Sequence, residues 1–188
     1  MVRTEPIRNP KHVKALVEHY RLQGHYRNHL LITIGVYTAL RISDILSLRC
    51  KDVYDFKNRS IYDTISLVEK KTGKSKIIAL PPKIIRALKL YLPEAVPGAP
   101  LFRNELTNKP LSRVQAHRII GDAASNIGLP YKVSSHSLRK TFGYHAWKNG
   151  AQPALLMEIY NHSSYDITKR YLGITQDDQN AIYRNLNI

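Results

Sequence analysis

Two histidines, an arginine and a tyrosine in the last third of the chain form a group that suits chemistry on a phosphate. His136 and Arg139 are three residues apart, so they lie on one face of a helix or of a helix start. His162 follows, and Tyr171 comes directly after Lys169-Arg170. A guanidinium binds two phosphate oxygens at once through parallel hydrogen bonds, and an imidazole can move protons near neutral pH. A tyrosine hydroxyl has an ordinary pKa of about 10 and becomes a useful nucleophile only where cations surround it.

The charge of the chain indicates a polyanionic partner. Its 188 residues include 29 Lys+Arg against 14 Asp+Glu, which gives a net charge of +15. Such an excess favours nucleic acid or an anionic membrane as partner. The basic residues are scattered and do not form a juxtamembrane cluster or a single basic amphipathic helix, which argues against a membrane.

The composition is typical of a globular protein from a reducing compartment. Hydrophobic residues make up 43% and charged residues 23%, so we expect a packed core. No run approaches the roughly 18 apolar residues of a membrane span, and the first residues lack the apolar core of a signal peptide. The single cysteine, Cys50, cannot form an internal disulfide, and we expect a partly buried bystander. These features predict a cytoplasmic protein.

Hydrophobic periodicity predicts a mainly α domain with a small antiparallel β-sheet, an α+β class. The expected helices cover residues 10–20, 26–39, 40–48, 81–92, 112–127, 136–149, 153–160, 164–172 and 176–186. Residues 60–69 and 75–80 flank Lys71-Thr72-Gly73-Lys74 and predict a β-hairpin with a lysine-rich tip. Residues 93–100, rich in proline, are typical of a loop. We expect one domain over 1–188, with a core at about 10–174 and a tail at 175–188.

Each further candidate residue has an ordinary structural explanation when it is taken alone. Arg41 follows an apolar helix and can be a charge at the edge of the core, or a partner of Asp44. Lys71 at a hairpin tip can be solvated surface, and His136 with Arg139 can be a helix N-terminal pair without function. Their joint order along the chain favours a shared site.

Five segments follow one another in a recognisable order. They are Ala39-Leu40-Arg41-Ile42-Ser43-Asp44-Ile45-Leu46, Lys71-Thr72-Gly73-Lys74, His136-Ser137-Leu138-Arg139-Lys140-Thr141, His162-Ser163-Ser164 and Thr168-Lys169-Arg170-Tyr171-Leu172-Gly173. In this order the chain resembles the catalytic domain of the tyrosine recombinases, the phage integrase family, over roughly residues 10–186. One H-x-x-R motif alone would carry no information, whereas five segments in register are a specific signal.

The resemblance implies a site-specific recombinase that integrates, excises or inverts DNA. Tyr171 would attack a phosphodiester, form a 3′-phosphotyrosyl bond and free a 5′-hydroxyl. Arg41 and Arg139 would hold the non-bridging oxygens as negative charge develops. The catalytic residues implied are Arg41, Lys71, His136, Arg139, His162 and Tyr171, with Asp44 in support.

The resemblance also assigns the proton transfers. His136 is the expected proton acceptor near the tyrosine hydroxyl, and His162 would donate a hydrogen bond to the phosphate. Lys71 would protonate the leaving 5′-oxygen, although the neighbouring lysines of the hairpin compete for this role. Asp44 would orient Arg41 or the backbone nearby. Neither a metal nor a cofactor is implied, because the arginines supply the positive charge and the sequence has no Walker loop.

Further basic residues are expected to contact phosphates of double-stranded DNA. They are Lys74, Lys76, Arg113, Arg118, Lys140 and Lys169. A solvated face is the alternative for the helix that begins at Ser112. By the same resemblance, protomers would self-associate on DNA into a tetrameric synapse, with accessory DNA-bending proteins as further partners.

Three positions or segments depart from the usual family pattern. Asn161 replaces the usual glycine, so we expect a left-handed backbone conformation that asparagine tolerates. Asp44 replaces the common glutamate and should still support the site. Only about ten residues precede the first helix, so we expect a short form without the N-terminal core-binding domain.

The tail and the overall activity leave alternatives open. Ile182 and Leu186 form an apolar stripe that packs either on the protein's own core or on a neighbouring protomer. A DNA-binding regulator without catalysis is one alternative function. A topoisomerase-like enzyme of type IB, which nicks and religates without synapsis, is another, and a fragment of a longer recombinase is a third reading of the chain.

Overall fold

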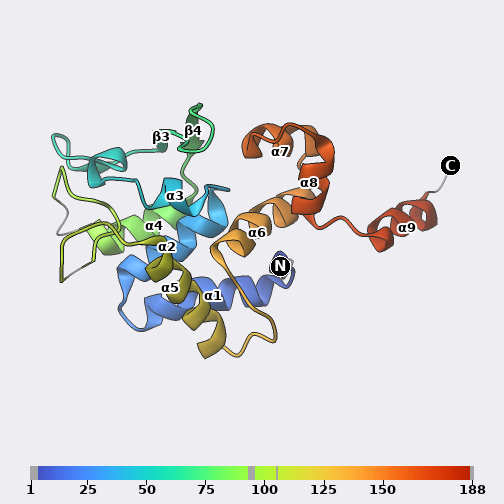
Figure 1. Cartoon of the computed structure of the whole chain (residues 1–188), viewed down its shortest axis with the longest axis horizontal. Helices are drawn as coiled ribbons and strands as arrows, with labels where there is room; N and C mark the ends of the chain where they lie inside the picture. The colour runs from blue at the N-terminus through green and yellow to red at the C-terminus, as the bar shows by residue number, and fades with distance from the viewer. Residues whose placement is uncertain (1–3, 93–95, 105, 187–188) are drawn as a thin grey trace.

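A computed structural model describes residues 4–92, 96–104 and 106–186 and shows a helical body with short strands along one side (Figure 1). The helices are α1 (Pro10–Leu22), α2 (Tyr26–Tyr37), α3 (Ile42–Ile45), α4 (Pro82–Tyr91), α5 (Arg113–Asn126), α6 (Ser135–Lys148), α7 (Pro153–Tyr160), α8 (Tyr165–Leu172) and α9 (Gln176–Asn185), with a 3-10 turn at Cys50–Asp52. The predicted fold class is confirmed. The helix expected at 40–48 is shorter than predicted, because only Ile42–Ile45 is helical.

Helix α2 lies at the centre of the body because it is apolar on nearly every face. It packs against α1, α4 and α6. Leu30, Leu31 and Ile34 join one core cluster with α4 and the strands, whereas Ile32 and Val36 join a second with α1 and α5. The chain that leaves α2 is therefore held from several sides, and this is the chain that enters the candidate site.

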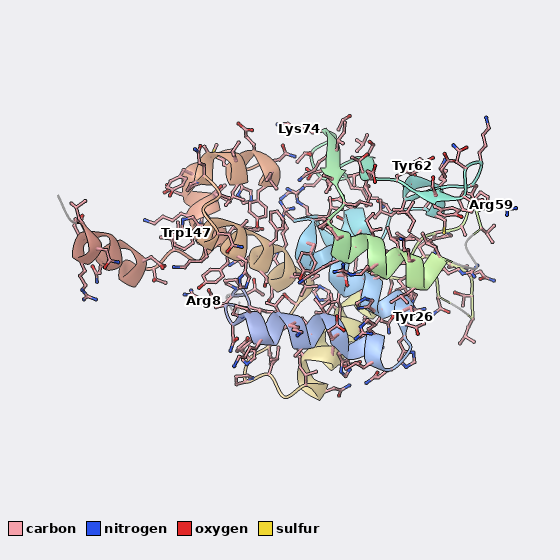
Figure 2. All side chains as sticks on the ribbon, turned by 180° about the vertical axis from the view of Figure 1, so that it is seen from behind. Arg8, Tyr26, Arg59, Tyr62, Lys74 and Trp147 are labelled. Atoms are coloured by element: carbon pink, nitrogen blue, oxygen red, sulfur yellow. The ribbon has the colours of Figure 1, made fainter. Side chains whose placement is uncertain are left out.

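The strands form two separate antiparallel ribbons. β1 (Tyr54–Asp55) pairs with β2 (Ser60–Ile61), and β3 (Thr64–Val68) pairs with β4 (Ser75–Ala79) with Thr64 opposite Ala79. The single strand predicted over 60–69 was wrong. The Tyr62 amide donates to the Val53 carbonyl at 3.1 Å, so the chain stays with the first ribbon before β3 begins. Lys74 lies at the tip of the β3–β4 hairpin, where it projects away from the body (Figure 2).

Serine caps fix the starts of α5 and α6. Ser112 and Ser134 each accept a hydrogen bond from the backbone three residues on, and the side chain of that third residue bonds back, which forms a capping box. The predicted cap at Ser112 is confirmed. Because Ser134 sets the start of α6, His136 and Arg139 fall in its first two turns.

The tail helix α9 stands apart from the body (Figure 1). Lys148 Nζ on α6 lies 2.6 Å from Asp178 Oδ1 on α9, and this ion pair ties the tail to the body. Tyr183 and Leu186 are 79% and 64% exposed. The side chain of Ile182 lies outside the described residues. The apolar side chains that are described in this tail thus face solvent.

Three smaller predictions concern a thiol, a loop and the membrane. Cys50 is a buried free thiol, as expected. The loop predicted at 93–100 contains a turn at residues 97–98, and residues 93–95 lie outside the described part of the chain. Within the described ranges, no helix has the length and apolar character needed to cross a bilayer.

The close approach of α6 to α7 yields a stability prediction. A Cβ added at Gly143 would lie 2.2 Å from the hydroxyl oxygen of Tyr160, which is fully buried and donates to the Arg139 carbonyl at 2.8 Å. We expect Gly143→Ala to lower the free energy of unfolding by about 1–3 kcal/mol through overpacking. Urea denaturation measures this. Gly121→Ala on α5 is the control, because a Cβ there meets nothing within 4 Å and should stabilise the helix by up to about 1 kcal/mol. Equal stability of the two variants would contradict the prediction.

Candidate active site

Tyr171 on α8 lies among side chains from α6 and from the turn between α7 and α8. Its hydroxyl is hydrogen bonded to Nε2 of His136 at 2.7 Å. The ring of His162 stands edge-on to the Tyr171 ring, with centroids 4.5 Å apart, and is stacked on the Tyr160 ring at 5.0 Å. Thr168 Oγ1 lies 3.0 Å from Nδ1 of His162 and fixes the second imidazole. Three residues singled out by the sequence analysis are thus brought together.

Two guanidinium groups from distant parts of the chain meet at the carbonyl oxygen of Tyr160. Arg139 Nη2 donates to this oxygen at 3.0 Å and Arg41 Nη2 at 3.5 Å. Arg139 is 2% exposed, and its Nη1 donates to the Ala39 carbonyl. Its guanidinium carbon lies 5.9 Å from the centroid of the Tyr171 ring. The two arginines therefore lie together beside the candidate nucleophile.

Two non-glycine residues of the site have left-handed backbones. Ala39 has φ 56°, a conformation that costs an ordinary residue about 1–2 kcal/mol and here accompanies the contact of its carbonyl with Arg139. Asn161 has φ 52° and ψ 45°, so the conformation predicted at this position is confirmed. It ends α7 and places His162 directly after the turn.

A buried carboxylate that the sequence analysis missed, Glu69, organises this group. Its Oε2 accepts hydrogen bonds from Arg41 Nη1 at 2.9 Å, Thr72 Oγ1 at 2.8 Å and Asn161 Nδ2 at 2.9 Å. Its Oε1 lies 3.6 Å from Lys76 Nζ. Burial alone would raise the pKa of Glu69, but the hydrogen bonds from Thr72, Asn161 and Arg41 outweigh it and lower the pKa to about 2. One signal was available, since Glu69 is the single acidic residue between positions 64 and 80.

Asp44 binds the backbone of the β3–β4 hairpin, whereas Arg41 pairs with Glu69. The Lys70 amide donates to Asp44 Oδ1 at 3.0 Å, which fixes the backbone next to Lys71. Asp44 is fully buried and turned toward this amide. The alternative in which Arg41 pairs with Asp44 is therefore corrected, whereas the contact of Asp44 with nearby backbone agrees with expectation.

A cleft of about 530 Å³ opens beside the tyrosine and contains two hairpin lysines. Besides the tyrosine, the two arginines and the first imidazole, its lining includes Ile42, Ser43, Lys70, Lys71, Arg113 and Ser135. Lys76 points elsewhere, because its ammonium donates to the Ile159 carbonyl, and burial lowers its pKa despite the neighbouring Glu69. The competition among hairpin lysines for the proton-donor role thus narrows to Lys70 and Lys71.

The basic residues expected to contact phosphates divide into two groups. Those with at least partly exposed side chains are Lys74, Arg113, Arg118 and Lys169. Among them Arg113 lines the cleft, and Lys169 lines a separate pocket. Lys76 and Lys140 are turned inward, and the Lys140 ammonium donates to the Thr4 carbonyl at 2.6 Å. Each ammonium has three N–H donors, so a single protein carbonyl does not use them all, and the phosphate contacts expected of Lys76 and Lys140 stay predictions.

Both imidazoles of the site favour the neutral form. Burial, followed by the positive charges of Lys140, Arg139 and Arg41, lowers the pKa of His136. Burial, followed by Arg139 and Arg41, lowers the pKa of His162 to about 4. A neutral His136 can accept a proton at Nε2, the nitrogen that faces the tyrosine hydroxyl.

Comparison with known proteins decides the family. The model of the phage integrase family matches residues 9–177. The chain belongs to this family. Because its relatives in this family are tyrosine-type site-specific recombinases, the chain is by family an enzyme of this type.

Two relatives illustrate the range of similarity. The probable integrase/recombinase YoeC of Bacillus subtilis (strain 168) is 38% identical over 180 residues, which cover 96% of this chain and 95% of that protein. The tyrosine recombinase XerC of Pelobacter propionicus is 28% identical over 149 residues, which cover 78% of this chain and 47% of that protein. The chain spans about half the length of the curated XerC and XerD relatives.

Solved structures show the same fold. The XerA recombinase superposes with a TM-score of 0.78 at 22% identity, covering 98% of this chain and 68% of that chain. A lambda integrase dimer bound to a COC′ core site gives a TM-score of 0.70 at 17% identity, covering 100% of this chain and 63% of that chain. The predicted catalytic-domain fold is confirmed.

The lowered pKa of His162 predicts that mild acid destabilises the protein. Its ordinary pKa is 6.5 and its folded pKa about 4, so between these values the unfolded chain binds more protons than the folded one. The melting temperature should therefore fall as the pH drops from about 6.5 to about 4, and His136 acts in the same direction.

Thermal denaturation at a series of pH values measures the effect. His162→Gln should weaken the pH dependence, whereas His25→Gln, at an exposed histidine, should leave it unchanged. Glu69 contributes in a lower window, since its stabilisation is present above its ordinary pKa of 4.5 and is lost as the pH falls toward about 2. A melting temperature that stays constant from about pH 6.5 to about pH 4 would contradict the prediction.

Proposed function

We propose that this protein cleaves and rejoins double-stranded DNA at specific sites, with Tyr171 as the nucleophile. The observation that carries the proposal is the hydrogen bond of 2.7 Å between the Tyr171 hydroxyl and His136, beside two arginines that share the Tyr160 carbonyl. Family membership supports recombinase activity, and integration, excision and inversion all use this chemistry.

The proposed step transfers a phosphoryl linkage from DNA to the enzyme. The Tyr171 oxygen forms a bond to phosphorus while the bond from phosphorus to the 5′-oxygen breaks, which leaves a 3′-phosphotyrosyl link. The phenolic proton passes to Nε2 of neutral His136. Lys71 in the cleft gives a proton to the leaving 5′-oxygen, and reversal of the step with a new 5′-hydroxyl rejoins the DNA.

The two arginines stabilise the negative charge that develops on the phosphate. The diester carries one negative charge and the pentavalent transition state close to two, so Arg41 and Arg139 on the non-bridging oxygens lower the barrier. Each terminal guanidinium nitrogen carries two hydrogens, and the existing contacts leave donors available. Arg139 Nε is buried without a hydrogen-bond partner in the described part of the chain. His162 donates a further hydrogen bond, and the step as proposed uses neither metal nor cofactor.

Net charge and family membership both support DNA as the partner. The net charge of +15 favours a polyanion, and Arg113 extends the cleft's positive lining.

We expect the domain to have a core at residues 10–174 and a tail at 175–188, and monomers to form a tetrameric synapse on DNA, assisted by DNA-bending proteins. The single buried thiol suits the reducing cytoplasm.

Covalent trapping tests the proposal. Suicide duplexes that contain the protein's recombination site should yield a protein–DNA adduct that survives denaturation. Tyr171→Phe should abolish the adduct and retain DNA binding, because only the hydroxyl is lost. Tyr165→Phe, at an exposed tyrosine on the same helix, should keep the adduct. Adducts without joined products would favour topoisomerase-like nicking, and binding without any adduct would favour a regulator and reject the proposed cleavage by Tyr171.

The exposed tail provides a second test, on assembly. We expect α9 to pack on a neighbouring protomer in the synapse, because Tyr183 and Leu186 face solvent. Deletion of residues from 175 onward should spare folding, DNA binding and adduct formation while recombination is lost. Circular dichroism, a mobility shift and a two-site recombination assay measure these properties. Unchanged recombination by the truncated protein would reject the tail's role.

A further inference from the structure

We infer that Glu69 is a positioning residue that sets Arg41 and the turn before His162 for the non-bridging oxygens of the DNA phosphate. This inference rests on the proposed DNA cleavage and adds a residue that the five matching segments do not include.

A single oxygen of Glu69 connects three parts of the site. Oε2 receives Arg41 Nη1 at 2.9 Å from the chain after α2, Thr72 Oγ1 at 2.8 Å from the hairpin, and Asn161 Nδ2 at 2.9 Å from the turn after α7. Asn161 directly precedes His162. A change in the place of this oxygen therefore moves a phosphate-binding guanidinium and the imidazole turn together.

Electrostatics explains why a full negative charge is needed there. Arg41 and Arg139 donate to the same Tyr160 carbonyl, so their positive charges repel at short range. Glu69 has 0% exposure, and a buried carboxylate attracts Arg41 more strongly than a solvated one would. Without that charge, the guanidinium of Arg41, whose side chain is 21% exposed, can turn toward solvent.

The second buried carboxylate serves the other side of the reaction. Asp44 Oδ1 accepts from the Lys70 amide at 3.0 Å, next to the proposed proton donor Lys71. The side chain of Glu69 does not touch Lys71 in any described contact. The two acids thus have different main contacts: Glu69 holds Arg41 and Asn161 and reaches the hairpin through the Thr72 hydroxyl, whereas Asp44 holds the Lys70 amide next to the lysine of the leaving group.

This difference in contacts predicts different responses to a change of leaving group. A duplex with sulfur in place of the bridging 5′-oxygen releases a thiolate, whose conjugate acid has a pKa near 8.5, so the step no longer needs a proton donor. Single-turnover adduct formation is measured on the oxygen and sulfur duplexes for wild type, Glu69→Gln, Lys71→Ala and Asp63→Asn. Asp63 is the matched control, because it is an exposed acid at the start of the same ribbon.

We expect Glu69→Gln to slow cleavage by about 10- to 100-fold on both duplexes, since a small misplacement of a charge-stabilising group costs rate whatever the leaving group. Lys71→Ala should be slow on oxygen and recover on sulfur, and Asp63→Asn should match wild type. A Glu69→Gln rate equal to wild type, or one restored by sulfur, would overturn the inference. A wild-type protein that forms no adduct would overturn the proposed function as well, which separates the two failures.

A conservative variant separates positioning from the need for a buried charge. Glu69→Asp keeps the charge but shortens the side chain by one methylene, so one carboxylate oxygen can no longer reach all three donors. We expect its melting temperature to exceed that of Glu69→Gln while its cleavage stays slow on both duplexes and its DNA affinity is unchanged. If Glu69→Gln fails to fold, Glu69→Asp decides alone, and a wild-type rate for it would overturn the inference.

Discussion

The carbonyl oxygen of Tyr160 accepts hydrogen bonds from two guanidinium groups that would otherwise repel each other. The rest of the site depends on where this oxygen lies. Tyr160 is itself fixed, because its ring lies 4.6 Å from the guanidinium carbon of Arg139 and its hydroxyl donates to the Arg139 carbonyl. The absence of a side chain at Gly143 lets α7 come this close to α6. Residue 41 and residue 139 are thereby brought to one point.

Several positive charges lie near Tyr171, but the two neighbouring histidines are neutral and do not add to them. Arg41, Arg139 and Lys71 carry charge into or beside the cleft, whereas burial and these same charges favour neutral His136 and His162. Neutral imidazoles reduce the repulsion that the fold must overcome, and they remain able to accept protons. The burial and the positive charges that keep the imidazoles neutral therefore also leave His136 able to accept a proton.

The sequence was sufficient for what depends on local patterns. Periodicity and a serine cap located most helices. The left-handed turn at Asn161 was expected because asparagine replaces the glycine that is usual at this position in the family. Side-chain direction was not predictable in the same way. Lys76 and Lys140 have stems long enough to reach either solvent or protein, and only the packed fold determines that they reach the carbonyls of Ile159 and Thr4.

Glu69 escaped sequence analysis for a related reason. Two of its three donors lie 28 and 92 residues away, so no window of the sequence contains the cluster. The paired ribbons gave the same difficulty on a smaller scale. Residues 60–69 are rich in Ile, Leu, Val and Thr, which favours one strand, and the contact of Tyr62 with Val53, nine residues earlier, shows that the chain stays with the first ribbon before β3 begins.

Asn161 has two properties in this site, and glycine could supply only one of them. Its backbone takes the left-handed form, which glycine adopts with less strain, and its amide nitrogen binds Glu69 at 2.9 Å, which glycine has no side chain to do. In this protein the residue that shapes the turn thus also donates a hydrogen bond to the buried acid. During evolutionary drift, positions 69 and 161 should consequently change together: once the acid is lost, selection no longer favours asparagine over glycine at the turn.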